Sequence, residues 1–285
     1  MRSITSPPHL ENLTESFDQQ MQYWADQLLM GDDLAGADIS KAEMKKNTPS
    51  VEAIQHALES NANLSEKMQQ GFTNILTVPF GLSRGELTNE MQRAMWVHSE
   101  DRNLRSSDGK NIVLPLKILD NQESMDSPVY FPDRFDPQDH GGRTKKQLFE
   151  KAKFPGWQVF LTENLQNIPL QGTGKIIGGR DQVEAGRTSS DYLRMFQGAD
   201  YTHEIASTLE AYQALFLMHL LQTKGEVLDS SAARRVCMCL GEYFPKANRI
   251  PCAASDQGAN QILFNVASPN FSVPACGTRT MVKVF

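Results

Sequence analysis

The first hundred residues repeat their apolar positions with the period of a helix. One apolar stripe, at spacings of three and four residues, consists of Leu13, Phe17, Met21, Trp24 and Leu28. A second helix is predicted to start at Thr48-Pro49, because proline is favoured at the first helical position. The same period continues through Met68, Phe72 and Ile75, and a further helix is expected to begin near Thr88.

Farther along the chain, the pattern changes to short extended runs and one long helix. Strands are predicted for Asn111 to Leu119, Val129 to Phe135 and Trp157 to Leu161. A helix over 203–222 is predicted from the apolar face formed by Ile205, Leu209, Tyr212, Phe216 and Leu220. Short extended pieces follow from Arg249 and end on the strand Met281 to Phe285.

This order of elements is segregated, which favours the α+β class over an alternating parallel sheet. We expect a mainly helical region at residues 1–110 and a second region at 111–285. The pattern leaves open whether the helical region is a separate domain or an elaboration of the same domain.

The charge of the chain limits its partners. The formal net charge is −6, which argues against nucleic acid as a main partner, because phosphate backbones need a basic surface. The short basic runs at Lys45-Lys46 and Arg143 to Lys146 are interpreted as solvated faces and not as a phosphate site. No apolar stretch is long enough for a membrane span, and the N-terminus does not resemble a signal peptide, so cytoplasmic synthesis is expected.

Several motifs suggest chemistry but lack the required spacing. The glycines between Gly172 and Gly179 fit neither a dinucleotide fingerprint nor a P-loop, so a structural turn is expected. His203-Glu204 lacks the second histidine of a zinc helix. We expect no metal, no cofactor and no catalytic residue. The alternative is a cysteine-dependent hydrolase or transferase, in which Cys237 or Cys252 is the nucleophile and His203 or His219 the base.

The segment from Cys252 to Cys276 has an unusual composition. It contains no Lys, Arg, Glu, Met or Trp, and Asp256 is its only charge. Such a bias would arise if the adenines of AAC-type codons were randomised by mutation. The resulting codons all end in C, so they cannot encode Lys, Glu, Gln, Met or Trp. In this segment only Gln257 and Gln261 depart from that set. A buried pair of strands would also lack charge, so composition alone leaves both interpretations open.

The residues that frame this segment narrow the choice. Leu240-Gly-Glu-Tyr-Phe-Pro245 and Ile250-Pro251 precede it, Gly258, Gln261 and Pro269 lie inside it, and Gly277, Arg279 and Val282 follow it. Farther upstream lie Gly156-Trp157-Gln158, Asn167-Ile168-Pro169, Gly178-Gly179-Arg180 and Asp191-Tyr192-Leu193. Together, from about Phe154 to Phe285, these motifs resemble the variable proteins of diversity-generating retroelements, in their archaeal, nanoarchaeal-type group.

The resemblance implies a C-type lectin-like fold at residues 111–285 that displays a hypervariable surface. Gly258 and Gly277 would serve close turns, and Arg279 would donate hydrogen bonds to loop carbonyls. The implied function is binding of a macromolecule, a protein on a host, symbiont or virus surface. The chain itself would be displayed on a surface or virion and would not be an enzyme. The implied variable, ligand-facing residues are Cys252, Ala254, Ser255, Asp256, Ala259, Asn260, Leu263, Asn265, Val266, Ala267, Asn270, Phe271, Ser272 and Val273.

Overall fold

A computed structural model describes residues 8–27, 39–101, 103–106, 109–112, 117–120, 127–229, 235–256 and 261–285. The N-terminal helices are α1 (Pro8–Gln27), α2 (Lys41–Lys46), α3 (Val51–Ser60), α4 (Ala62–Gln69) and α5 (Arg84–Glu100). The later helices are α6 (Lys145–Glu150), α7 (Ser189–Phe196), the 3-10 turn η1 (Ala199–Tyr201) and α8 (Leu209–Gln222). The α+β class expected from the sequence is confirmed.

Local capping moves two of the expected helix starts. The start at Thr48-Pro49 is wrong, because the Thr48 hydroxyl donates back to the carbonyls that end α2, and Ser50 instead caps α3 by accepting from the Ala53 amide. Helix α5 begins one turn before Thr88, because Ser83 forms a capping box with Glu86.

A four-stranded antiparallel sheet lies next to the helices. Its order is β1 (Asn74–Val78), β4 (Gln158–Thr162), β13 (Thr280–Lys283) and β7 (Glu204–Ala206). Three residues expected in helices lie outside them here. Phe72 and Ile75 follow Gly71, which ends α4 with φ +96°, and Ile75 lies in β1. Ile205 lies in β7, since the long helix starts only after its cap Thr208.

A second sheet has five strands and carries the unusual C-terminal segment. Its order is β12 (Cys276–Gly277), β8 (Val236–Met238), β10 (Ile250–Asp256), β11 (Gln261–Ala267) and β2 (Lys117–Asp120). Two small two-stranded sheets join β3 (Val129–Tyr130) to β9 (Glu242–Tyr243) and β5 (Ile176–Ile177) to β6 (Arg180–Asp181). Of the strand predicted for Asn111 to Leu119, residues 117–119 lie in β2, whereas residues 111 and 112 lie outside the named strands and residues 113–116 lie outside the described residues.

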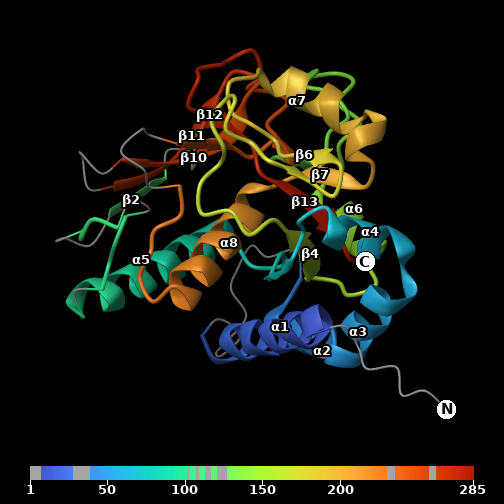
Figure 1. Cartoon of the computed structure of the whole chain (residues 1–285), viewed down its shortest axis with the longest axis vertical. Coiled ribbons are helices and arrows are strands. Elements are labelled where there is room, and N and C mark those ends of the chain that lie inside the picture. The colour runs from blue at the N-terminus through green and yellow to red at the C-terminus, as the bar shows by residue number, and fades with distance from the viewer. Residues whose placement is uncertain are drawn as a thin grey trace.

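One large apolar core joins the N-terminal helices to both large sheets. Helices α5 and α8 lie side by side in the middle of the molecule, with α1 to α3 on one side and β10 to β12 on the other (Figure 1). The core includes Trp24 of α1, Met91 of α5, Phe216 of α8 and Phe264 of β11. The boundary at residue 110 therefore does not separate two cores.

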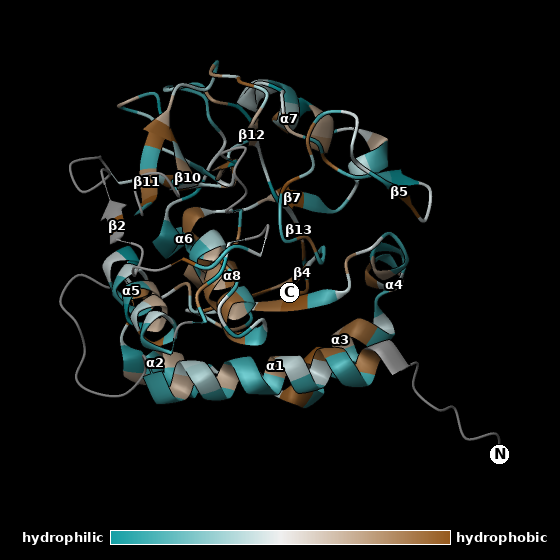
Figure 2. Cartoon of the chain, turned by 60° about the vertical axis from the view of Figure 1, so that its left-hand side comes forward, coloured by the Kyte–Doolittle hydropathy of each residue, from teal (hydrophilic) through white to brown (hydrophobic). Residues whose placement is uncertain are grey.

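Helix α1 also covers the outer edge of the first sheet, and Figure 2 shows it running along the base of the molecule with mixed apolar and polar residues. The Gln20 side chain donates to the Ile75 carbonyl and accepts from the Thr77 amide, while the Trp24 indole donates to the Thr77 carbonyl. These side chains take the place of a neighbouring strand on β1, so this edge is not open for pairing. Among the described residues, no helix is both long and apolar enough to cross a membrane.

Candidate ligand-binding surface

The pairing of β10 with β11 gives the C-terminal segment one buried face. Ala253 pairs with Phe264 and Ser255 with Ile262, and all four side chains are buried. Because side chains alternate along a strand, these residues point to one side of the sheet, toward the main core. The expectation that Ser255 faces a ligand is therefore wrong in this arrangement.

The opposite face of the same two strands is more open. Ala254 pairs with Leu263 and Asp256 with Gln261, and each of these four residues is partly exposed. Asn265, whose partner across the strands is Cys252, is exposed. We call the side of the sheet formed by these residues the outer face.

Helix α7 covers the far part of the outer face. Tyr192 of α7 packs in a second apolar cluster with Met238, Ile250 and Cys276, and the Ser189 hydroxyl contacts the Met238 sulfur at 3.4 Å. Cys252 pairs with Met238 and is buried, so the expectation that Cys252 contacts a ligand is also wrong. Val266 and Ala267, at the end of β11, are partly exposed.

A loop over residues 268–275 extends the open surface and carries its largest exposed side chains. Phe271 is 43 % exposed and Val273 is 37 % exposed, and Asn270 and Ser272 are exposed as well. The loop is held by its own turns and by a hydrogen bond from the Ser272 hydroxyl to the Gly186 carbonyl, 3.2 Å long. Ala259 and Asn260, which were expected to be variable, lie outside the described residues.

Arg279 holds the backbone behind this surface. The Arg279 guanidinium pairs with both oxygens of Asp229, at 3.0 and 2.8 Å, and donates to the carbonyls of Leu165 and Gln166. The expected hydrogen bonds from Arg279 to loop carbonyls are thus confirmed. Burial by itself lowers the pKa of Arg279, but the Asp229 carboxylate outweighs this effect and raises the pKa.

Gly277 permits a close approach between β12 and the preceding loops. A Cβ atom at Gly277 would lie 2.5 Å from the Ile168 side chain and 3.3 Å from Ala185. No other residue type fits this position without a shift of its neighbours. The expectation that Gly277 serves a close turn is wrong, because Gly277 lies in the strand β12 and its lack of a side chain serves close packing instead, whereas Gly258 lies outside the described residues.

The glycine-rich stretch after Pro169 is a turn whose amides are already bound. The Glu184 carboxylate accepts from the amides of Gly172 and Gly174, at 2.9 and 2.6 Å, and these hydrogen bonds lower the pKa of Glu184. An internal carboxylate thus occupies the amide donors that an external phosphate would need.

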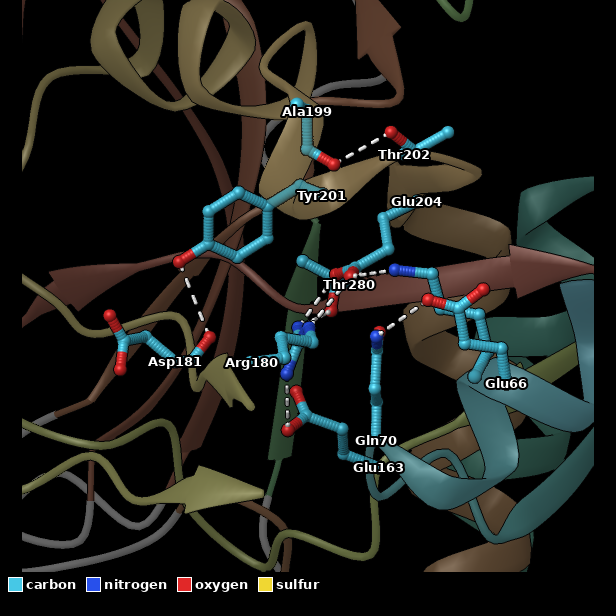
Figure 3. Close-up of polar contacts among 11 residues, drawn as sticks. Glu66, Gln70, Glu163, Arg180, Asp181, Ala199, Tyr201, Thr202, Glu204 and Thr280 are labelled. Carbon is cyan, nitrogen blue, oxygen red and sulfur yellow. Dashed lines mark hydrogen bonds and ion pairs between the residues drawn. The ribbon is translucent and has the colours of Figure 1, made fainter. Parts of the chain in front are cut away.

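Glu204, which the sequence offered as a possible acid–base or metal-binding residue, lies in a buried ionic network. Figure 3 shows the Arg180 guanidinium between Glu204 and Glu163. Arg180 makes two bonds of 2.6 Å to Glu204 and one of 3.1 Å to Glu163, and Lys67 of α4 reaches Glu204 at 2.8 Å. The two cations of this network balance its two carboxylates, so no charge is left over for a ligand. The network therefore links the N-terminal helices to the sheet. Its partners are too far apart in the sequence for any local motif to reveal them.

The basic run Arg143 to Lys146, which was interpreted as a solvated face, is not exposed at every position. Lys145 is only 15 % exposed, and its ammonium lies 3.2 Å from the carboxylate of Glu210, which is fully buried. The interpretation is therefore wrong for Lys145, because α8 places a buried carboxylate beside it. Arg143 and Lys146 are exposed as expected.

The four cysteines do not have the surroundings of catalytic thiols. Cys237, Cys239, Cys252 and Cys276 are free and buried. Burial raises the pKa of the Cys252 thiol to about 12 and that of Cys276 to about 11. Among the described residues, no group of three or more His, Cys, Asp and Glu side chains could hold a metal ion. The cysteine-nucleophile alternative thus lacks a reactive thiolate at Cys252.

A thiol reagent tests this directly. We expect an aromatic disulfide reagent at pH 8 to label no cysteine quickly in the folded protein and all four after unfolding, because a thiol of pKa 12 is ionised in only about one molecule in ten thousand. The measurement is the stopped-flow absorbance of the released aromatic thiol. Rapid labelling of one cysteine, slowed by His219→Ala, would support the enzymatic alternative.

Comparison with known proteins returned no match to a family model, to a curated protein or to a solved structure.

Proposed function

We propose that the chain is a non-enzymatic binding protein whose ligand surface is the outer face of β10 and β11 together with the loop 268–275. One observation carries the proposal: of the twelve implied variable residues that the structure describes, only Cys252 and Ser255 are buried. The buried face and Arg279 then form a framework that does not depend on the exposed side chains. Such a division suits a surface that changes by mutation, because the core tolerates changes in volume poorly.

The chemistry of this surface favours a protein partner. Phe271 and Val273 offer apolar contact, while Asn265, Asn270 and Ser272 offer hydrogen bonds. An exposed aromatic ring among small polar side chains is typical of surfaces that bind proteins. Because Asp256 is the only charged residue of the segment, binding should depend little on salt. We further propose that the region from 111 onward is a C-type lectin-like scaffold and that the segment is diversified by a retroelement, as the framing motifs indicate.

Two phenylalanines form a matched test of the framework. Phe264→Ala is expected to destabilise the protein by about 3–5 kcal/mol, because it empties a fully buried site. Phe271→Ala is expected to cost less than about 1 kcal/mol, since the ring is 43 % exposed. Urea unfolding followed by circular dichroism measures both. Equal losses would show that the loop is part of the core and would remove the basis of the proposal.

Binding is tested by a displayed library. Residues Leu263, Asn265, Asn270, Phe271, Ser272 and Val273 are randomised together and selected on purified lysozyme, beside a library of the same size at exposed positions of α1. Specific binders should come from the first library and not from the second. A first library that folds but yields no binder would contradict the proposal.

Independently, the neighbouring DNA should encode a reverse transcriptase and a near-copy of the gene end that differs mainly at adenines.

A further inference from the structure

A charged cavity of about 460 Å³ lies beside the starts of α5 and α6. Its size is within the range of small-molecule sites. Its charged and polar lining includes Arg84, Tyr130, Thr144, Lys145, Lys146 and Glu210, and none of the described residues that line it belongs to the 252–276 segment. The cavity is therefore separate from the proposed binding surface.

Two cations at this cavity are held in place by carboxylates and aromatic rings. The Lys145 ammonium lies 4.6 Å from the centre of the Phe80 ring and pairs with Glu210. The Arg84 guanidinium lies 5.3 Å from the centre of the Phe244 ring and forms an ion pair with Glu242. These contacts fix both long side chains before any ligand arrives, which reduces the entropy that binding would cost.

The charges lie in layers. Lys145 and Arg84 are 15 % and 19 % exposed, whereas Glu210 and Glu242 have no exposed side-chain surface. A molecule in the cavity therefore meets cations first, with the carboxylates behind them. Burial by itself raises the pKa of Glu210, but Lys145 and Arg84 outweigh it and lower the pKa to about 2, so this carboxylate stays charged and keeps both cations in position.

Lys146 and the start of α5 add to the positive side of the cavity. Lys146 is exposed and lines the cavity beside Lys145. Among the described residues at the cavity, three cations (Arg84, Lys145 and Lys146) lie beside two buried carboxylates (Glu210 and Glu242), an excess of one positive charge. Helix α5 has 17 residues and begins at Arg84, which lines the cavity, while the backbone amide of its cap Ser83 is already bound by the Glu86 carboxylate. The nearby Glu86 is balanced by Lys41 at 3.2 Å.

We propose that this cavity binds the phosphate group of a small phosphomonoester. Three basic side chains from two helices suit a tetrahedral dianion, which offers oxygens in several directions, better than a planar carboxylate with two oxygens. Lys146 contacts the group from the open side, while Arg84 and Lys145 contact it from the floor.

The test uses the full-length chain and inorganic phosphate as the probe, by isothermal titration calorimetry at constant ionic strength. The wild-type protein should bind one phosphate saturably. Lys146→Gln should weaken binding about tenfold, the effect of one lost charge-assisted contact. Lys151→Gln is the matched control, because Lys151 is an exposed lysine that caps the other end of α6 and does not line the cavity. That control should change the affinity less than twofold.

Three results would overturn the proposal. The first is the absence of saturable phosphate binding to the wild-type chain. The second is an equal loss of affinity in both lysine variants, which would indicate a general effect of charge. The third is acetate binding as strong as phosphate binding. Thermal melting of each variant checks folding, which neither exposed lysine should change.

Discussion

Arg279→Ala is expected to destabilise the protein by about 3–5 kcal/mol, the typical cost of removing one partner from a buried ion pair. The Asp229 carboxylate, which has no exposed side-chain surface, would lose both of its bonds to the guanidinium. The carbonyls of Leu165 and Gln166 would lose their donor at the same time. Urea unfolding of the variant, compared with the wild-type chain, measures the loss.

Two further variants separate the ion pair from a general effect of charge. Arg194→Ala removes an arginine whose side chain is 77 % exposed, and it should cost less than about 0.5 kcal/mol. Asp229→Asn combined with Arg279→Met should recover part of the loss, because no buried charge is then left alone. A double variant that is less stable than the sum of the two single changes would contradict this account of Arg279.

Removing residues 1–110 is expected to abolish cooperative folding. The fragment 111–285 would lose β1 from the edge of the four-stranded sheet and every apolar contact from α1 to α5. Glu204 would also lose Lys67 from the buried network. A domain that loses this much of its core retains too little buried area to offset chain entropy. The measurement is thermal unfolding followed by near-ultraviolet circular dichroism, in which the fragment should show no sharp transition.

Mixing the two fragments provides the control for this experiment. If the regions share one core, fragment 1–110 added to fragment 111–285 should restore a cooperative transition. A mixture in which 1–110 carries Trp24→Ala should restore it less well, because Trp24 is fully buried and bonds to β1. A fragment 111–285 that melts cooperatively by itself would instead establish a separate C-terminal domain.

Some elements of the fold were predictable from the sequence, and others were assigned to the wrong kind of structure. The stripe of α1 from Leu13 to Trp24 was predictable because it has one helical period, and the strand near Trp157 because it is a short run of mostly apolar residues. Leu28, also expected in the stripe, lies outside the described residues. Ile75 and Ile205 were assigned to helices, because an apolar residue at either end of a helical pattern fits an adjoining strand equally well. Gly71 marks the end of α4 before β1, and the cap Thr208 marks the start of α8 after β7.

For the candidate surface, the sequence also could not show which side chains are exposed. Composition marked the whole 252–276 segment and could not separate its two faces. Pairing does so, because the register of β10 against β11 sends Ser255 inward and Ala254 outward. Lys145 was misjudged for a similar reason: its partner Glu210 lies on a helix 65 residues away in the chain, and no local pattern connects the two.

The sequence by itself determined the α+β class, the apolar stripes that build the core and the unusual segment with its frame of Gly277 and Arg279. These properties depend on local period and composition, which neighbouring residues encode. Only the tertiary structure decided that the N-terminal helices share the core with the sheets, which side chains of the segment remain exposed, and which charges meet in the interior. Those outcomes depend on contacts such as Lys67 with Glu204, 137 residues apart. Burial makes such contacts strong, and chain folding alone selects the partners.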